Sequence, residues 1–418
     1  MNAVIKFIEE NLIKTIRFND KNQDTLLGLP YPYTVPSVDT MFQEMYYWDT
    51  YFTNVGLIIS GNVKQAQHNV NNMMYLIETY GYMPNGNRIY YLNRSQPPFL
   101  FLMVRDIFQQ ERDEEWLKKA YKSLEIEYSF WQNHRVAPNG LNVYGNSQKI
   151  KEQDLLVLNK EYVARTGVPT ADTVEDMTEY AHAMLAFSES GWDCTSRFEL
   201  EGHHYNPVDL NSLLYGFERY MQEISGVLAN GKEVLWKERA DLRKKKMDEY
   251  LWNSDKQLYM DWNFCEGHFS PILSAASLYP LFFQICDSIK GEEDLLDKLL
   301  LNYGVSATES IGIETNYQWD YPNVWAPLQY IACIGCQNYG RLDVAKKIAS
   351  RYTLLIENGF DDTGNLWEKY DGNTGRVSSQ DYTAPTMMGW TAGTYLYFKN
   401  YLDEIAAGSD GNHERIKR

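Results

Sequence analysis

The stretch GNVKQAQHNVNNMMYLIETYG, residues 61–81, has the pattern that decides the fold class of this chain. Its apolar side chains, from Val63 to Ile77, recur every three or four residues, with polar side chains between them. This period places the apolar groups on one face of an α-helix. Gly81 follows the last turn, and glycine commonly ends a helix. The stretch therefore predicts an amphipathic helix that packs against other helices.

The same period recurs along most of the chain, whereas the alternation typical of strands is scarce. We expect an all-α protein in which helix hairpins stack into a ring. No Pro-, Gly- or Ser-rich linker divides the chain, so residues 1–405 are predicted to form one domain, followed by a polar tail, 406–418. The predicted helices are 2–16, 48–60, 63–79, 95–109, 113–135, 172–187, 208–227, 231–251, 271–288, 291–302, 323–338, 341–358 and 387–404.

Charge and hydropathy argue against two kinds of partner. The 418 residues carry a net charge of −17, and the pI is near 4.9. Phosphate binding needs clustered Lys and Arg, so nucleic acid is not an expected partner. No uninterrupted apolar run is long enough to span a membrane. Residues 1–18 contain acids and lack the apolar core of a signal peptide, which predicts a cytoplasmic protein. The oligomeric state stays open.

Cysteines and histidines do not indicate a metal or a cofactor, and we predict neither. The five cysteines are an odd, sparse set, which argues against a disulfide framework. Cys333 and Cys336 have no second pair and no nearby His, so we expect core thiols. The adjacent His203 and His204 lack a third ligand at a useful spacing along the chain.

Long connections carry the residues that could form a site, because loops of this length are usually functional in a compact domain. Four runs place a carboxylate beside Trp or Tyr: EMYYWDTYF, SGWDCTSRF, NYQWDYPNVWAP and WEKYDGNTGRVSSQDYTAPTMMGWTAG. A fifth, YMPNGNRIYYLNRSQPP, adds amide and guanidinium groups. Aromatic faces can stack on sugar rings and carboxylates can accept hydrogen bonds from sugar hydroxyls, so the runs predict a carbohydrate pocket. The connections are 17–47, 80–95, 136–171, 188–207, 303–323 and 359–387.

Glycoside hydrolysis requires two carboxyl groups with different duties. One protonates the leaving oxygen, and the other activates water or attacks the sugar directly. Their separation decides between inversion and retention. The sequence does not supply that distance.

The run QWDYPNVWAP, Gln318–Pro327, resembles the second signature of the trehalases, glycoside hydrolase family 37. The runs YYWDTYF, YMPNGNRIYYLNRSQPP, SGWDCTSRF, VDLNSL and GWTAG fall in that family's order, so the resemblance covers residues 35–400. It implies an (α/α)6 barrel with the active site in loops at one end. It also implies inverting hydrolysis of an α-glycoside.

By this resemblance Asp193, in the GWD motif, is the general acid. Asp381, followed by Tyr382, stands where the family places its basic Glu, and Glu368 is the rival base. An Asp carboxylate sits about one methylene further from its neighbours, so the departure bears on catalysis. The resemblance and the aromatic–acid runs together predict a sugar-binding set of Phe42, Tyr46, Trp48, Asp49, Asn85, Arg94, Gln96, Trp192, Arg197, Gln318, Trp319, Asp320 and Trp390.

Two further departures concern the leaving-group half of the pocket. Met41 stands where the family's first signature has Arg, and the family's Arg-Pro-Glu-Ser segment has no clean match. The nearest region contains Arg165 as its single Arg. We therefore expect a small α-glucoside as substrate, with trehalose itself in question.

Alternative interpretations remain at this stage. The chain could be a carbohydrate-binding protein with impaired catalysis, a hydrolase of glucosyl- or mannosylglycerate, or a helical toroid that binds a protein partner. Single residues also have structural alternatives: the Trp side chains could anchor helices, and Asp49 and Asp320 could cap them. For Asp209 capping is the preferred interpretation.

Overall fold

Helices dominate the computed structural model, which describes residues 2–39, 41–145, 150, 152–288, 290–313 and 315–407. The α-helices are α1 (Ala3–Asn11), α2 (Tyr47–Ile59), α3 (Val63–Tyr80), α4 (Leu100–Glu111), α5 (Glu114–His134), α6 (Glu152–Thr166), α7 (Val174–Ser190), α8 (Val208–Val227), α9 (Glu233–Tyr250), α10 (Tyr279–Phe282), α11 (Lys290–Leu299), α12 (Ala326–Asn338), α13 (Leu342–Thr363) and α14 (Gly389–Ala406). The short 3-10 helices are η1 (Leu12–Thr15), η2 (Ile89–Tyr91), η3 (Ser196–Phe198), η4 (Gly202–His204) and η5 (Ala275–Leu278).

Strands are short and lie in the connections. The antiparallel pairs are β1 (Ile16–Arg17) with β2 (Tyr33–Thr34), β4 (Trp252–Asn253) with β5 (Leu258–Tyr259), β8 (Leu300–Leu301) with β9 (Gly304–Val305), and β10 (Asn323–Trp325) with β11 (Lys369–Asp371). A three-stranded sheet joins β3 (Tyr205–Asn206), β6 (Trp262–Asn263) and β7 (His268–Phe269). Pairing of β10 with β11 ties together two of the runs predicted to carry the site.

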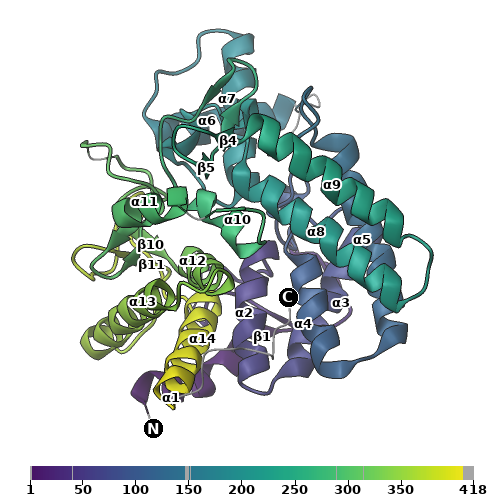
Figure 1. Ribbon diagram of the computed structural model, residues 1–418, viewed down its shortest axis with the longest axis vertical. Helices are drawn as coiled ribbons and strands as arrows, with labels where there is room; N and C mark the ends of the chain where they lie inside the picture. Colours follow the sequence, from purple (N-terminus) through teal and green to yellow (C-terminus); the bar gives the residue numbers. More distant parts are fainter. Residues whose placement is uncertain are drawn as a thin grey trace.

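The helices form a closed ring, whose members are labelled in Figure 1. Going round it, α2 contacts α4, α4 contacts α8, and α8 contacts α10; α10 contacts α12, α12 contacts α14, and α14 returns to α2. Helices α3, α5, α9 and α13 pack against members of this ring. The predicted all-α class and the (α/α)6 arrangement of helix hairpins are confirmed.

Helix α3 confirms the prediction from residues 61–81. Its buried face includes Ala66, Val70 and Ile77, and it contacts α2, α4 and α5. Gly81 follows the helix with φ 84°, a left-handed conformation that glycine adopts without steric strain.

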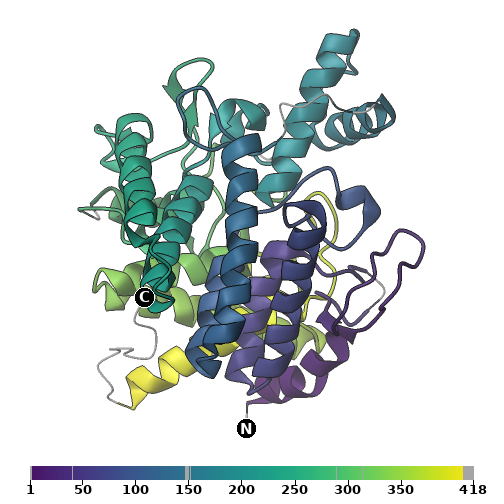
Figure 2. The same cartoon turned by 90° about the vertical axis from the view of Figure 1, so that its right-hand side faces the viewer.

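Some predicted boundaries are wrong for identifiable reasons. Helix α4 begins at Leu100 rather than at 95, because Pro97 and Pro98 disfavour helix in the residues before them. The predicted helix 271–288 is reduced to η5 and α10. Helix α6 lies inside the predicted connection 136–171, and its many charged and polar side chains hide its period. It pairs with α7, and the two project beyond the ring in Figure 2.

One large hydrophobic cluster extends from Val4 to Tyr401. A smaller cluster, which includes Tyr162 and Phe187, joins α6 and α7 to η3. Cys333 and Cys336 are buried in α12, as predicted for core thiols. No helix in the described ranges is long and apolar enough to cross a membrane. The one-domain division at residue 405 stays a prediction; α14 ends at Ala406, and 408–418 of the predicted tail lie outside the described residues.

Candidate active site

A cavity of about 290 Å³ is lined by most of the residues predicted to form the site. Its walls come from the first turns of α2 and α14, from α6, from the end of α7, and from the connections beside them. The predicted residues on its lining are Phe42, Tyr46, Trp48, Asp49, Asn85, Arg94, Gln96, Asp193, Gln318, Trp319, Glu368 and Trp390. Chain segments more than 300 residues apart in sequence therefore meet at one site.

An aromatic wall forms one side of the cavity. The rings of Trp319 and Trp325 stack in parallel, with centroids 3.9 Å apart and planes 4° apart. Trp48 lies 5.7 Å from Trp319, and Trp390 stands edge-on to Trp325 at 5.7 Å. Because each indole is held by others and at most 4% of its surface is exposed, the wall is a rigid and largely buried side of the cavity.

Amide and guanidinium groups give the cavity a polar surface as well. The Arg94 Nε donates to Asn85 Oδ1 at 3.0 Å, and its guanidinium lies over the ring of Tyr91 at 5.1 Å. The Trp48 backbone N–H donates to Gln96 Oε1 at 3.3 Å, so this contact uses the amide oxygen of Gln96 and not its nitrogen. Fixed donors of this kind suit recognition of sugar hydroxyls.

Three carboxyl groups on the lining have raised pKa values, chiefly because burial disfavours their charged forms. The pKa of Asp49 rises to about 8, with the charges of Glu368 and Asp193 adding to the burial. Burial also raises the pKa of Asp193, against the opposing effect of Arg165. The cavity therefore holds carboxyl groups that keep a proton at higher pH than free acids do, as a general acid requires.

Glu368 is the third of these carboxyls, and it accepts a hydrogen bond from a neighbouring tyrosine. Its pKa rises to about 7 because of burial, opposed by the neighbouring Lys369 and by the hydrogen bond that Tyr382 Oη donates at 2.9 Å. Lys369 is itself held in place, donating to Gln318 Oε1 at 2.9 Å and to the Gln380 carbonyl at 2.6 Å. Glu368 Oε2 is buried without a hydrogen-bond partner among the described residues.

Asp381, the predicted base, is not among the residues that line the cavity. Its carboxylate accepts a hydrogen bond from Arg165 Nη1 at 3.0 Å, and its backbone has φ 63°. Arg165 does line the cavity, so the ion pair connects Asp381 to the lining. Its charge acts on both Asp193 and Glu368.

Arg197 was predicted to bind the sugar, and the structure contradicts this. The side chain is fully buried, and its guanidinium donates to Asp261 at 2.6 and 2.7 Å and to Asp209 at 2.6 and 3.2 Å. These carboxylates occupy the donors that would reach a substrate. Asp209 lies within the first turn of α8 and pairs with Arg197, so the predicted N-cap is also wrong.

Asp320 and Trp192 also lie off the lining and support it from behind. Asp320 Oδ1 accepts from Thr195 Oγ1 at 3.0 Å and from the Ser196 backbone N–H at 2.9 Å, while Thr315 Oγ1 donates to its other oxygen at 3.0 Å. Trp192 is fully buried and stacks 5.2 Å behind Trp319. Both residues therefore position the loop of the proposed acid instead of facing the cavity.

Several residues of the lining are not in the predicted sugar-binding set. The aromatic–acid and amide-rich runs of the sequence contain four of them, Tyr91, Trp325, Tyr382 and Met387, so the composition of these runs could have pointed to them. Glu161 lies on α6, the helix that the sequence pattern did not reveal. The unassigned lining residues are Met41, Tyr91, Glu161, Arg165, Ser188, Gly191, Trp325, Tyr382 and Met387.

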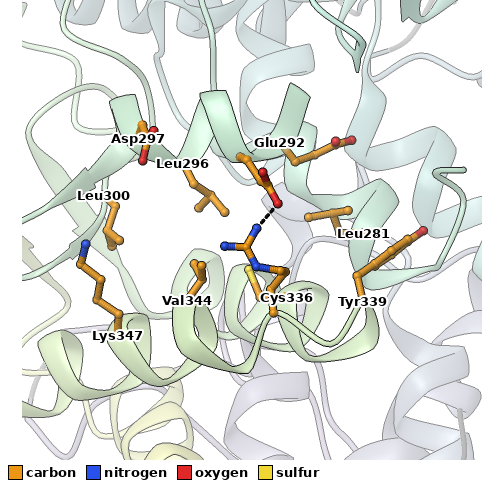
Figure 3. Close-up of a pocket in the computed structure, with 11 residues that line it drawn as sticks. Leu281, Glu292, Leu296, Asp297, Leu300, Cys336, Tyr339, Val344 and Lys347 are labelled. Atoms are coloured by element: carbon orange, nitrogen blue, oxygen red, sulfur yellow. Dashed lines mark hydrogen bonds and ion pairs between the residues drawn. The ribbon is translucent and has the colours of Figure 1, made fainter. Parts of the chain in front are cut away.

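A second cavity, of about 90 Å³, lies between α11 and the α12–α13 connection (Figure 3). Leu296 and Val344 face each other across it, and two further lining residues, Arg341 and Glu293, form an ion pair. None of the predicted site residues belongs to it. The larger cavity is therefore the candidate active site.

Comparisons with known proteins bear on the family and the fold of this chain. A curated periplasmic trehalase of Escherichia coli O8 (strain IAI1) is 35% identical over 408 aligned positions, which cover 90% of this chain and 70% of that protein. The structure of neutral trehalase Nth1 from Saccharomyces cerevisiae superposes with a TM-score of 0.76 at 25% identity, covering 97% of this chain and 81% of that one.

A family 63 mannosylglycerate hydrolase from Thermus thermophilus shares the fold, with a TM-score of 0.65 at 15% identity, covering 95% of this chain and 100% of that one. The predicted cytoplasmic location is contradicted by the curated relatives, several of which are periplasmic trehalases of Escherichia coli. The sequence model of the trehalase family matches residues 4–403. The chain is accordingly a glycoside hydrolase and belongs to the trehalase family.

Proposed function

We propose that this enzyme hydrolyses trehalose with inversion, and that Asp193 is the general acid. The observation that carries the proposal is the placement of Asp193, with a raised pKa, on the lining of the cavity that the wall of indoles also lines. A carboxyl that retains its proton can donate it to the glycosidic oxygen. The substrate rests on the trehalases among the relatives.

We propose Asp381 as the group that activates water. Its carboxylate pairs with the guanidinium of Arg165 at 3.0 Å, which fixes it beside a residue of the cavity lining. Glu368 is the second candidate, because it lines the cavity and Asp381 does not. With a pKa of about 7, Glu368 would be ionised in only part of the molecules at neutral pH.

The leaving-group half of the pocket bears on substrate choice. Met41 stands on the lining with 49% of its surface exposed, at the position where the family signature has Arg. A thioether cannot donate hydrogen bonds to a second sugar. A related small α-glucoside is therefore the second candidate substrate.

We also infer a periplasmic location from the relatives, which cell fractionation would test.

The test combines substrate, stereochemistry and residue roles. Purified enzyme is incubated with trehalose and a panel of α-linked disaccharides and glycosides, and the anomers released first are read by NMR. From trehalose we expect α- and β-glucose in equal amounts, because inversion makes the attacked residue the β-anomer while the leaving glucose keeps its α configuration. Release of α-glucose alone would contradict inversion, and a clear preference for another glycoside would reassign the substrate.

Asp193→Asn should reduce turnover by about 10³-fold or more while sugar binding survives, because the amide cannot supply the proton. Asp381→Asn and Glu368→Gln then separate the candidate bases. Azide, a small anionic nucleophile, should restore turnover with a β-glucosyl azide product only in the variant that lacks the base. Near-normal turnover by Asp193→Asn would overturn the assignment of the acid.

A further inference from the structure

Three side chains able to ligate a metal meet where α7 contacts η4. Glu179 lies on α7, and His203 and His204 form the end of η4. One potential ligand atom of each residue lies within 4.8 Å of the others. None of the three lines the candidate active site. The cluster is therefore separate from the residues that line the candidate active site.

The spacing of the ligand atoms suits a small divalent ion. His203 Nε2 lies 2.8 Å from Glu179 Oε2, and His204 Nε2 lies 3.8 Å from the same oxygen. Zinc bonds of about 2.0–2.2 Å in a tetrahedron place ligand atoms about 3.3–3.5 Å apart. The observed values lie on either side of this range, so small side-chain rotations would accommodate the ion.

We propose that Glu179, His203 and His204 bind a divalent transition-metal ion of the zinc class, with water as the fourth ligand. The ligand types match, since imidazole nitrogen and carboxylate oxygen are common zinc ligands. Access is also suitable: the Glu179 side chain is 58% exposed, whereas that of His203 is 16% exposed. An ion could enter from solvent and rest on a partly buried imidazole.

The surroundings of the imidazoles support ligation. His204 Nδ1 lies 3.3 Å from Glu201 Oε2, which leaves its Nε2 to face Glu179. A carboxylate on the second ring nitrogen orients a ligating His and raises its basicity.

The position of the cluster gives the ion a structural consequence. Helix α7 precedes Asp193 along the chain, and η4 follows it. An ion bound by Glu179 and the two histidines would join both sides of the segment that carries the proposed acid. Binding should therefore stabilise the folded protein, whether or not the catalytic assignment holds.

The experiment uses the full chain without an affinity tag and zinc chloride as the probe. Metal-free enzyme is dialysed against zinc, bound metal is counted, and Tm is recorded with and without zinc. We expect about one ion per chain, a zinc-dependent rise in Tm, and intense visible absorption from tetrahedral cobalt(II) when cobalt chloride replaces zinc.

Glu179→Gln is the main variant, because this exposed side chain can change without disturbing the core. It and His204→Ala should each weaken zinc binding at least about tenfold and abolish the rise in Tm. His68→Ala is the matched control, since His68 stacks on Tyr31, outside the cluster, and binding should not change. Absence of stoichiometric zinc in the parent enzyme, or unchanged binding in Glu179→Gln, would overturn the proposal.

Discussion

Individual buried carboxyls determine much of the electrostatics of this enzyme. Glu127, on α5, is fully buried and accepts a hydrogen bond from Tyr47 Oη, while Tyr47 Oη accepts from the Leu100 backbone N–H. Burial raises the pKa of Glu127 to about 8. Its Oε2 has no hydrogen-bond partner among the described residues. The protonated acid is therefore the form that suits this place in the fold.

Glu127→Gln should make stability less dependent on pH. In the parent enzyme the folded-state pKa of about 8 exceeds the unfolded value of 4.5, so the folded chain holds a proton that the unfolded chain has lost. Stability therefore falls as pH rises from about 4.5 to about 8, with a slope of up to about 1.4 kcal/mol per pH unit from this group. Glutamine mimics the protonated acid and removes that slope.

Urea unfolding at intervals between pH 5 and pH 9 measures the effect. We expect the free-energy difference between variant and parent to shift in favour of the variant as pH rises. A difference that stays constant across this range would show that Glu127 does not titrate in the way its burial implies.

At the scale of elements, the loop that carries Asp193 depends on a neighbouring loop for its position. Asp320 accepts hydrogen bonds from Thr195 and Ser196 through one oxygen and from Thr315 through the other. The Trp192–Trp319 stack joins the same two loops. The proposed acid is therefore positioned by contacts to a segment more than 100 residues away in sequence.

Asp320→Asn should lower kcat by about 10–100-fold with a smaller change in KM, because a site left without its supporting contacts loses its geometry. Asparagine retains one acceptor oxygen, and its amide nitrogen would face a donor. We expect a loss of about 1.5–3 kcal/mol of stability, measured by urea unfolding. Thr315→Val removes one of these bonds and should have a milder effect on both quantities. A kcat equal to that of the parent would refute a positioning role for Asp320.

At the scale of the whole molecule, closure of the ring depends on a close approach between its first and last helices. A Cβ at Gly393, on α14, would lie 1.9 Å from the Phe52 carbonyl oxygen of α2, and a Cβ at Gly56 would lie 2.9 Å from the Gly393 Cα. Two glycines thus let the backbones of α2 and α14 meet. Asp49 and Trp390 stand on these two helices, so their separation also depends on this contact.

Gly393→Ala should destabilise the enzyme by at least about 1–3 kcal/mol, because the obstructing atom is backbone and cannot rotate away. Activity should fall as well, since α2 and α14 carry parts of the cavity lining. Thermal unfolding and turnover measure the two effects.

Gly226→Ala is the matched control: this glycine lies on α8, and its nearest contact is a flexible Glu233 side chain at 3.5 Å. The control should be neutral or slightly stabilising; equal Tm values for the two variants would contradict this account of ring closure.

Local patterns in the sequence were sufficient for most helices and singled out many of the residues that line the larger cavity. Helix α8 was predicted at its observed bounds, and Trp48, Asp193 and Trp319 lie on the cavity as expected. Arg197 was misassigned, since nothing in its own run shows that Asp261, far along the chain, takes up its donors. The third member of the proposed metal site, Glu179, was missed because it lies 24 residues before His203.

The sequence by itself determined the helical period, the positions of the aromatic–acid runs and the departures at Met41 and Asp381, because these are properties of neighbouring residues. Tertiary structure alone decided which side chains share a cavity, which acids retain protons, and which charges are already paired. Proton affinity depends on burial and on charges brought close by folding. Those distances arise from the closed ring, in which helices far apart in the chain pack against one another.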